Sequence, residues 1–371
     1  LYEKEEDIHA LEDAVWSVCD EYTWALPAHL GGQGLSRLED DGYTIDLFAG
    51  ETACLLSEVM ALVGDKLAPI VVKRARYLVE TRVLDRMLEA HFNWEKSKNN
   101  WAAVCAGSVG IAAMYETDGE KLAALLERMQ AAMESYVSSF PADGTSMEGI
   151  SYWTYGFAFF TAYAEMLFRR TEGEIDWFKD ERVHQIALFQ QKAYFEGGNI
   201  IKFADCNPAD TTRWWGLTSY MKSRYPDVDS LPRPYFSAYT GDACYRWAGM
   251  LRDLAWSDES LDENHKPDKN YILPDAQWLI CNGKNGVSFA AKGGTNGESH
   301  NHNDVGSFEL FKNGEEMLID YGGGMYSRAY FSETRYDQFA CGSQGHNVPI
   351  VEGKTQLAGP EYGTGSVSFG E

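Results

Sequence analysis

Two histidines and an aspartate lie within five residues in the segment SHNHND, residues 299–304. The chain has only eight histidines, so this clustering is unusual. Imidazole serves near neutral pH as a proton carrier or as a metal ligand. Because alternate residues of a strand point to the same side, His300 and His302 are predicted to converge on one site. The alternative is a pair of surface histidines in a polar loop.

A second group of candidate ligands lies further along the chain. His346 belongs to a polar segment, and Asp320 ends an apolar run that is typical of a strand. Together with His302 they would offer two imidazoles and one carboxylate, which suits zinc with an open fourth position. Asp304 is the alternative carboxylate.

The spacing sets a condition on this metal site. The Asn313-Gly314 pair predicts a two-residue hairpin turn, which places Ser307 opposite Asp320. His302 would then lie roughly 16 Å beyond Ser307 along an ideal strand. A bend near Gly306 is therefore needed to bring His302 to Asp320.

Three polar segments precede this region. Asn99-Asn100-Trp101 opens a predicted helix, where an Asn pair is typical of a cap. In the segment EGISYWTYG, residues 148–156, Tyr152 and Tyr155 are spaced to share one helix face. These tyrosines suit either a site or core packing. The segment 205–208, Asp-Cys-Asn-Pro, is predicted to turn and to line a cleft.

Hydrophobic periodicity predicts helix after helix up to about residue 260. The predicted helices span 47–63, 69–91, 101–115, 119–140, 152–170, 180–195 and 241–256.

From about residue 270 the pattern becomes that of strands and tight turns. The predicted strands lie at 278–281, 287–291, 308–311, 317–320, 348–351 and 366–369. The polar linker 258–269 places a domain boundary near 262–270.

The composition limits the partners of this protein. The net charge of −24 excludes nucleic acid as the general partner. An anionic substrate would need a local basic cleft, and the candidate cations are Arg76, Arg213, Arg328 and Arg335. We also predict no membrane partner, because we find no apolar run long enough to span one. The sequence leaves the oligomeric state open, a homodimer included.

Seven scattered cysteines without a C-x-x-C pair are typical of free thiols. They favour a cytoplasmic location, with a periplasmic or secreted one as the alternative. The chain opens in helical sequence and ends in a strand-like pattern, so we expect both ends to continue in a longer protein.

The segment 299–308, its continuation through Asn313-Gly314 to Gly322, and the segment 345–353 resemble the heparinase II/III family of polysaccharide lyases. The segments 99–101 and 149–156 resemble that family's helical motifs, in the expected order. The resemblance implies an incomplete (α/α) toroid over residues 1–262. It also implies the first part of an antiparallel β-sandwich over residues 270–371.

The resemblance further implies a lyase that cleaves an acidic, uronate-containing polysaccharide such as heparan sulfate or alginate by β-elimination. Carried over by position, Tyr155 or its neighbour Tyr152 resembles the catalytic tyrosine, and His300 the catalytic histidine. Asn100 resembles the residue that contacts the substrate carboxylate. The further candidates for substrate contact are Asn99, Trp101, Glu148, Trp153 and Arg335.

The resemblance also implies a structural zinc ion held by His302, Asp320 and His346. Some members carry a histidine directly after the Asn, where this chain has Trp101. Two other functions fit the same residues. One is a zinc-dependent carbohydrate hydrolase, and the other is a carbohydrate-binding protein without catalytic activity.

Overall fold

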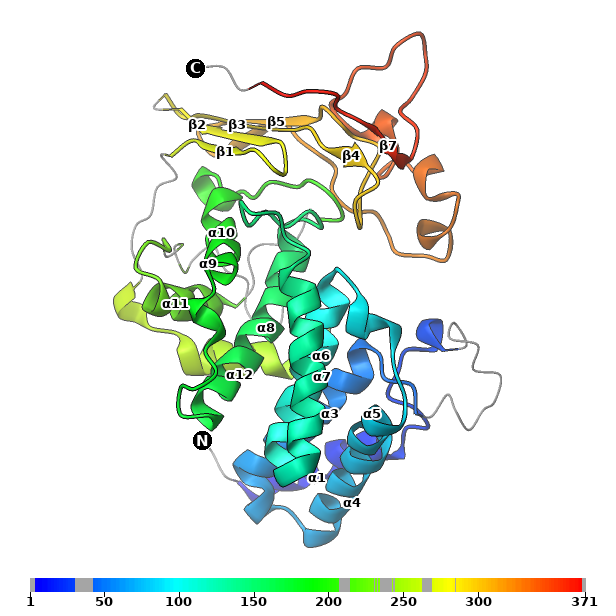
Figure 1. Ribbon diagram of the computed structural model, residues 1–371, viewed down its shortest axis with the longest axis vertical. Helices are drawn as coiled ribbons and strands as arrows, with labels where there is room; N and C mark the ends of the chain where they lie inside the picture. Colours follow the sequence, from blue (N-terminus) through cyan, green and yellow to red (C-terminus); the bar gives the residue numbers. More distant parts are fainter. Residues whose placement is uncertain are drawn as a thin grey trace. The chain divides into compact units, whose positions relative to one another are not determined.

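The computed structural model describes residues 4–30, 43–206, 214–229, 231, 233, 242, 244–261, 269–283 and 285–368 (Figure 1). The chain divides into two compact units. The helical unit comprises residues 1–138, 156–176 and 246–249, and the sheet unit comprises residues 139–155, 177–245 and 250–371.

The helical unit is built from long helices joined by short turns. Its helices are α1 (Glu5–Asp20), α3 (Leu47–Val63), α4 (Pro69–Val79), α5 (Asp85–Glu89), α6 (Asn100–Glu116), α7 (Gly119–Val137) and most of α8 (Ile150–Arg170). A π-helical turn, Glu80–Leu84, joins α4 to α5.

Helix α6 is the centre of this unit, since almost every side chain along it is buried. Two glycines allow a neighbouring helix to approach closely. A Cβ at Gly107 would lie 2.8 Å from the carbonyl oxygen of Phe159, and one at Gly110 would lie 2.4 Å from the Tyr163 ring. Both contacts are with α8, so small residues fix the packing distance between α6 and α8.

One helical stretch, Leu47–Lys66, is long and apolar enough to cross a membrane by length and composition alone. The sequence analysis had found no such run. Half of the stretch is buried within the protein, and it includes the fully buried Glu58. It packs on α6, where a Cβ at Gly50 would meet Ser108 at 3.4 Å. These are the features of a core helix.

The sheet unit contains a five-stranded antiparallel sheet and a two-stranded one. The larger sheet has the order β1-β2-β3-β5-β6, and β4 pairs with β7 in the smaller one. The strands are β1 (Tyr271–Leu273), β2 (Trp278–Asn282), β3 (Val287–Lys292), β4 (Thr295–Asn296), β5 (Phe308–Lys312), β6 (Glu315–Leu318) and β7 (Gly359–Gly363).

The segment 189–203 packs against the larger sheet. Phe203 meets Trp278 edge-on with ring centroids 5.0 Å apart, and Phe195 lies 4.6 Å from Phe311. Helices α9 (Glu181–Ala187), α10 (Phe189–Lys192), α11 (Trp215–Arg224), part of α12 (Trp247–Trp256) and the start of α8 belong to the same unit. The aromatic contacts hold the chain just before Asp205 on the sheet.

The order of elements predicted from the sequence, helices and then an antiparallel sheet, is confirmed. The helix 47–63 has the predicted bounds. The predicted helix 180–195 is instead broken into α9 and α10, and α12 starts at Trp247 rather than at 241. The boundary near 262–270 stays a prediction, because residues 262–268 lie outside the described residues.

Two strand predictions are wrong. The segment 348–351 forms only an isolated bridge from Val351 to Lys354, and Pro349 has no N–H for a ladder. Residues 366–368 have no regular structure, and Phe369 lies outside the described residues. The short strands β1, β4 and β7 were not predicted, since none has a clear alternating pattern.

Gly149 lies directly before α8 and sets the position of its first turn. Its φ is +89°, and a Cβ there would lie 2.7 Å from the carbonyl oxygen of Phe203. We predict that Gly149→Ala lowers the free energy of unfolding by about 3 kcal/mol, because left-handed strain and a backbone clash add together. Denaturant unfolding measures this loss.

Gly306→Ala is the matched control in the same unit. Gly306 also has a positive φ, +86°, but a Cβ there meets nothing within 4 Å. Only the backbone strain applies, and we expect a loss of about 1 kcal/mol. Equal losses in the two variants would show that the approach of Gly149 to Phe203 is unimportant.

Candidate active site

The loop 297–307, between β4 and β5, carries both histidines of the first motif. It is not a strand, because His300 has φ +56° and Gly306 has φ +86°. The predicted strand geometry is therefore wrong, yet the two imidazoles still converge on one group. The loop is held from outside by Ser343 Oγ, which donates to the Asn303 carbonyl oxygen at 2.7 Å. Gln356 bonds both backbone groups of Val305.

The group on which the imidazoles converge is the buried carboxylate of Asp205. His300 Nδ1 lies 2.8 Å from Oδ2, and His302 Nε2 lies 2.8 Å from Oδ1. Arg335 Nη2 donates to Oδ1 at 2.9 Å. The Tyr326 hydroxyl donates to Oδ2 at 3.2 Å, and the Tyr330 hydroxyl donates to Oδ1.

This environment keeps Asp205 ionised. Burial alone would raise the pKa of the carboxyl group. The hydrogen bonds from His300 and His302 and the charge of Arg335 outweigh this effect of burial, and they hold the pKa of Asp205 far below its usual range. A carboxylate can only accept, so each imidazole nitrogen that faces it carries a proton. In neutral His300, the lone pair is therefore on Nε2.

Tyr152, on the first turn of α8, lies against His300. The two rings stack with centroids 4.1 Å apart and planes at 26°. The Tyr152 hydroxyl forms a short hydrogen bond with the hydroxyl of Tyr326. Burial raises the pKa of Tyr152, the bond with Tyr326 opposes this rise, and the charges of Asp205 and Glu148 add to it. The phenol is thus protonated near neutral pH.

Glu148 lies on the Nε2 side of His300. Its Oε1 is 3.6 Å from that nitrogen, and it accepts a hydrogen bond from Ser299 Oγ at 3.2 Å. The carboxylate is positioned to pair with the imidazole once Nε2 takes up a proton. Tyr155 is half-buried one helical turn beyond Tyr152.

A cluster of candidate metal ligands lies on the other side of His302. The ligand atoms of His302, Asp304 and His346 all fall within 4.8 Å of one another, and all three residues are buried. His302 Nδ1 and Asp304 Oδ2 are buried without a hydrogen-bond partner. Because the Nε2–H of His302 donates a hydrogen bond to Asp205, neutral His302 has a lone pair on Nδ1.

Asp304 Oδ1 accepts from Lys292 Nζ at 2.8 Å, and the two nitrogens of His346 face Asp320 Oδ2 and the Ala340 carbonyl oxygen. A divalent metal ion would therefore be held first by His302 Nδ1 and Asp304 Oδ2, and His346 would join them only by giving up one of its hydrogen bonds.

Asp320 lies beside this cluster. Its Oδ2 is 2.8 Å from His346 Nδ1 and accepts from Ser307 Oγ at 3.4 Å. The predicted register holds at Lys312–Glu315 and Phe311–Glu316 but shifts by one residue at Leu310, which pairs with Leu318. Ser307 and Asp320 meet through their side chains, and the approach of His302 to Asp320 stays a prediction. Asp304, the alternative ligand, is the carboxylate within the cluster, while Asp320 as a ligand stays a prediction.

A second group, Asp205, His302 and Cys341, also lies within metal-binding distance. It suits a cation poorly, because the Asp205 carboxylate already accepts from five donors, namely His300, His302, Tyr326, Tyr330 and Arg335.

The other predicted site residues are described by their own surroundings. Trp153 is 1% exposed and donates from Nε1 to the Ile186 carbonyl oxygen at 2.8 Å, which is a core position and not one for sugar contact. In the helical unit, Asn99 caps α6 by accepting from the Trp101 N–H at 3.1 Å. Asn100 is buried, and Trp101 meets the His29 ring edge-on. Their contact with substrate stays a prediction.

The four candidate cations have different positions. Arg335 is buried on Asp205 and is thus a positioning group within the network rather than a surface contact. Arg76 pairs with Glu116 in the helical unit at 3.4 Å. Arg213 lies outside the described residues. Arg328 is exposed and has no ion pair within the described ranges.

Sequence reasoning did not find three members of the network. Asp205 was expected only in a turn that lines a cleft, and Asn207-Pro208 of that turn lies outside the described residues. Tyr326 and Tyr330 were not singled out. The spacing Tyr326–Tyr330–Arg335 after a hairpin was the available signal, but nothing in it specifies a shared carboxylate.

Comparisons with known proteins bear on the fold and on the family of the sheet-forming segment. Residues 272–367 match the family model described as Heparinase II/III-like, C-terminal. The resemblance inferred from the sequence is confirmed, since this segment is similar to the C-terminal domain of the heparinase II/III-like family. No curated protein matches the chain.

Solved structures share the fold over most of the chain. A heparinase III structure is 13% identical and covers 96% of this chain and 53% of its own, with a TM-score of 0.67. Heparan sulfate lyase HepC from Pedobacter heparinus is 15% identical over 90% of this chain and 50% of its own, with a TM-score of 0.54. The chain thus spans about half the length of these structures.

The Asp205 network predicts a pH-dependent contribution to stability. Because the folded pKa lies below the ordinary carboxyl value of about 4, the contribution is present above that value and is lost as the pH falls below it. We predict that Asp205→Asn costs about 3–5 kcal/mol at pH 7, since it leaves buried charges unpaired. The difference from the wild type should shrink at about pH 3.

Denaturant midpoints at the two pH values measure this effect. Asp337→Asn, which changes an exposed aspartate on the segment after Arg335, is the control and should leave both midpoints unchanged. If Asp205→Asn lowered the midpoint equally at both pH values, the result would contradict an ionised Asp205 in the folded protein.

Proposed function

We propose that this chain carries the active site of a polysaccharide lyase that cleaves an acidic polysaccharide by β-elimination. The observation that carries the proposal is the stack of Tyr152 on His300, with His300 Nδ1 anchored to Asp205. It places a proton acceptor and a proton donor side by side. The heparinase II/III-like domain and the fold shared with heparan sulfate lyases support the same reaction class.

The reaction removes the C5 proton of a uronate and expels the oxygen on C4. We assign the base to His300 Nε2, because its Nδ1 proton is fixed on Asp205. The C5–H and C4–O bonds break, and a C4–C5 double bond forms. Imidazolium then lies between Asp205 and Glu148, whose carboxylates stabilise its charge.

We assign the acid to Tyr152, which gives its hydroxyl proton to the departing oxygen. Its raised pKa suits a donor better than a base. Tyr152 rather than Tyr155 is our candidate, since its ring contacts His300. Asn100, carried over from the family resemblance, and the exposed Arg328 are candidates for neutralising the substrate carboxylate.

We propose a uronate polymer as substrate, either of the heparan sulfate type, as in the name of one structural neighbour, or of the alginate type. The net charge of −24 favours a plain uronide over a heavily sulfated chain.

We predict that Tyr152→Phe lowers kcat by about 100-fold or more, with unsaturated uronate ends read by their ultraviolet absorbance. Tyr155→Phe is the matched change one turn along the same helix. Full activity of Tyr152→Phe together with inactivity of Tyr155→Phe would move the acid to Tyr155. Products without a double bond from every polyuronide would instead point to a hydrolase.

The proposed metal is zinc in a structural role. His302 and Asp304 are fully buried, so an ion held there would have little room for a reacting water. This burial argues against the zinc hydrolase. When bound, zinc would supply a cross-link between the loop 297–307 and the segment that carries His346.

We predict that the purified protein holds about one zinc ion per chain, measured by elemental analysis, and that His302→Ala loses it. Chelation should lower the melting temperature of the wild type but not that of His302→Ala. His184→Ala, which alters a histidine paired with Asp227, should keep the ion. Retention of zinc by His302→Ala would remove this histidine from the ligands.

A further inference from the structure

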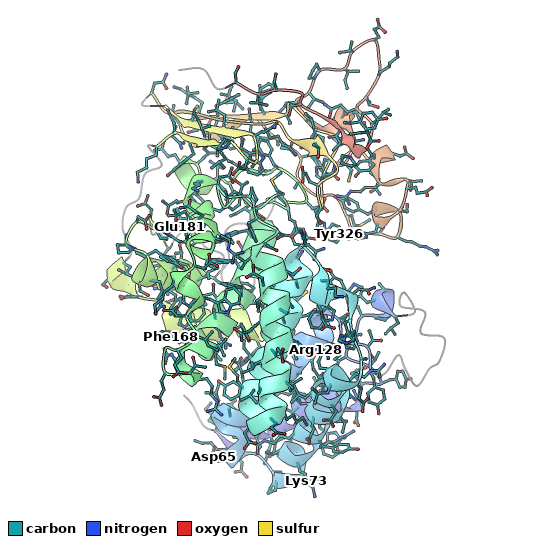
Figure 2. All side chains as sticks on the ribbon, in the orientation of Figure 1. Asp65, Lys73, Arg128, Phe168, Glu181 and Tyr326 are labelled. Atoms are coloured by element: carbon teal, nitrogen blue, oxygen red, sulfur yellow. The ribbon has the colours of Figure 1, made fainter. Side chains whose placement is uncertain are left out.

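We propose that Tyr326 is a positioning residue that holds the hydroxyl of Tyr152 and stabilises it as it loses its proton. This inference rests on the proposed lyase function and extends it to a residue that is not a candidate base or acid. Tyr326, which is labelled in Figure 2, lies between β6 and the short helix Ala329–Phe331. Its hydroxyl joins Tyr152 to Asp205.

Neighbouring rings fix the orientation of Tyr326. Its ring lies 5.0 Å from the Tyr330 ring and meets Phe331 edge-on at 4.9 Å. Tyr330 is itself buried, and its hydroxyl bonds Asp205. Although residue 326 is 47% exposed, its hydroxyl is held at both ends, by Tyr152 and by Asp205. Such an arrangement positions a hydroxyl without burying the whole ring.

The charge of Asp205 sets the direction of this chain of hydrogen bonds. The carboxylate only accepts, so the single proton of Tyr326 points to Asp205 Oδ2 at 3.2 Å. The Tyr326 oxygen must then accept the proton of Tyr152. The Tyr152 hydroxyl therefore donates its hydrogen bond to Tyr326 until a glycosidic oxygen replaces Tyr326 as the acceptor.

The direction reverses when Tyr152 gives up its proton. The oxygen of Tyr152 then carries negative charge and can only accept, and the Tyr326 O–H is the neighbouring donor. Rotation of one hydroxyl from Asp205 to Tyr152 supplies that bond, and Asp205 keeps its bonds from His300, His302 and Arg335. This interaction is stronger in the transition state than in the resting site, so it acts on kcat.

The test compares Tyr326→Phe with Tyr321→Phe in the full chain. Both variants keep a ring and remove one hydroxyl from an exposed tyrosine on the same segment, and the Tyr321 ring contacts Phe339 outside the network. We expect kcat of Tyr326→Phe to fall about 10- to 100-fold with KM within about twofold, on whichever of heparan sulfate or alginate the wild type cleaves. Tyr321→Phe should match the wild type. An unchanged kcat, or a change confined to KM, would overturn the proposal.

A second readout needs no substrate. In protein with 13C-labelled tyrosine rings, the Tyr152 signal is the one missing from Tyr152→Phe. We expect Tyr326→Phe to shift this signal and to speed the exchange of the Tyr152 hydroxyl proton, while Tyr321→Phe leaves both unchanged. An unmoved signal would overturn the role of Tyr326. If the wild type forms no unsaturated product, the lyase function fails, and the NMR comparison still decides whether Tyr326 holds Tyr152.

Discussion

The sheet unit is organised around one buried negative charge. Asp205 comes from the segment that follows α10, and its five hydrogen-bond partners come from two later segments, 300–302 and 326–335. Burying a carboxylate is costly unless donors surround it. These two segments, which have little regular structure, are thus held in place by their hydrogen bonds to the single carboxylate of Asp205.

The same carboxylate couples two functions that would otherwise be separate. His300 and His302 bind opposite oxygens of Asp205, so the imidazole proposed as base and the imidazole proposed as metal ligand share one anchor. The shared anchor also fixes which nitrogen of each ring carries a proton. A metal ion on His302 would stiffen the loop that presents His300, and no metal chemistry at the sugar is needed for that effect.

Turn residues and apolar periodicity predicted those parts of the fold that depend on residues close together in the sequence. The Asn313-Gly314 turn pairs Lys312 with Glu315 as predicted, and apolar periodicity gave the helix 47–63 with its observed bounds. The site itself depends on contacts between residues as far apart as 205 and 335. No periodicity connects them, and the positive φ of His300 in a non-strand loop has no signature in residue type. The sequence could therefore suggest which histidines matter but not the carboxylate that joins them.

The charge balance explains how an acidic protein can present such a site to an anionic polymer. Arg335 forms an ion pair with Asp205, so its positive charge balances that carboxylate and not a charge of the substrate. For the uronate substrate proposed above, the groups left to meet its carboxylate would be neutral hydrogen-bond donors and exposed cations such as Arg328. Such a site has little long-range attraction for a polyanion and relies on short-range hydrogen bonds. This is consistent with the proposed substrate of low charge density.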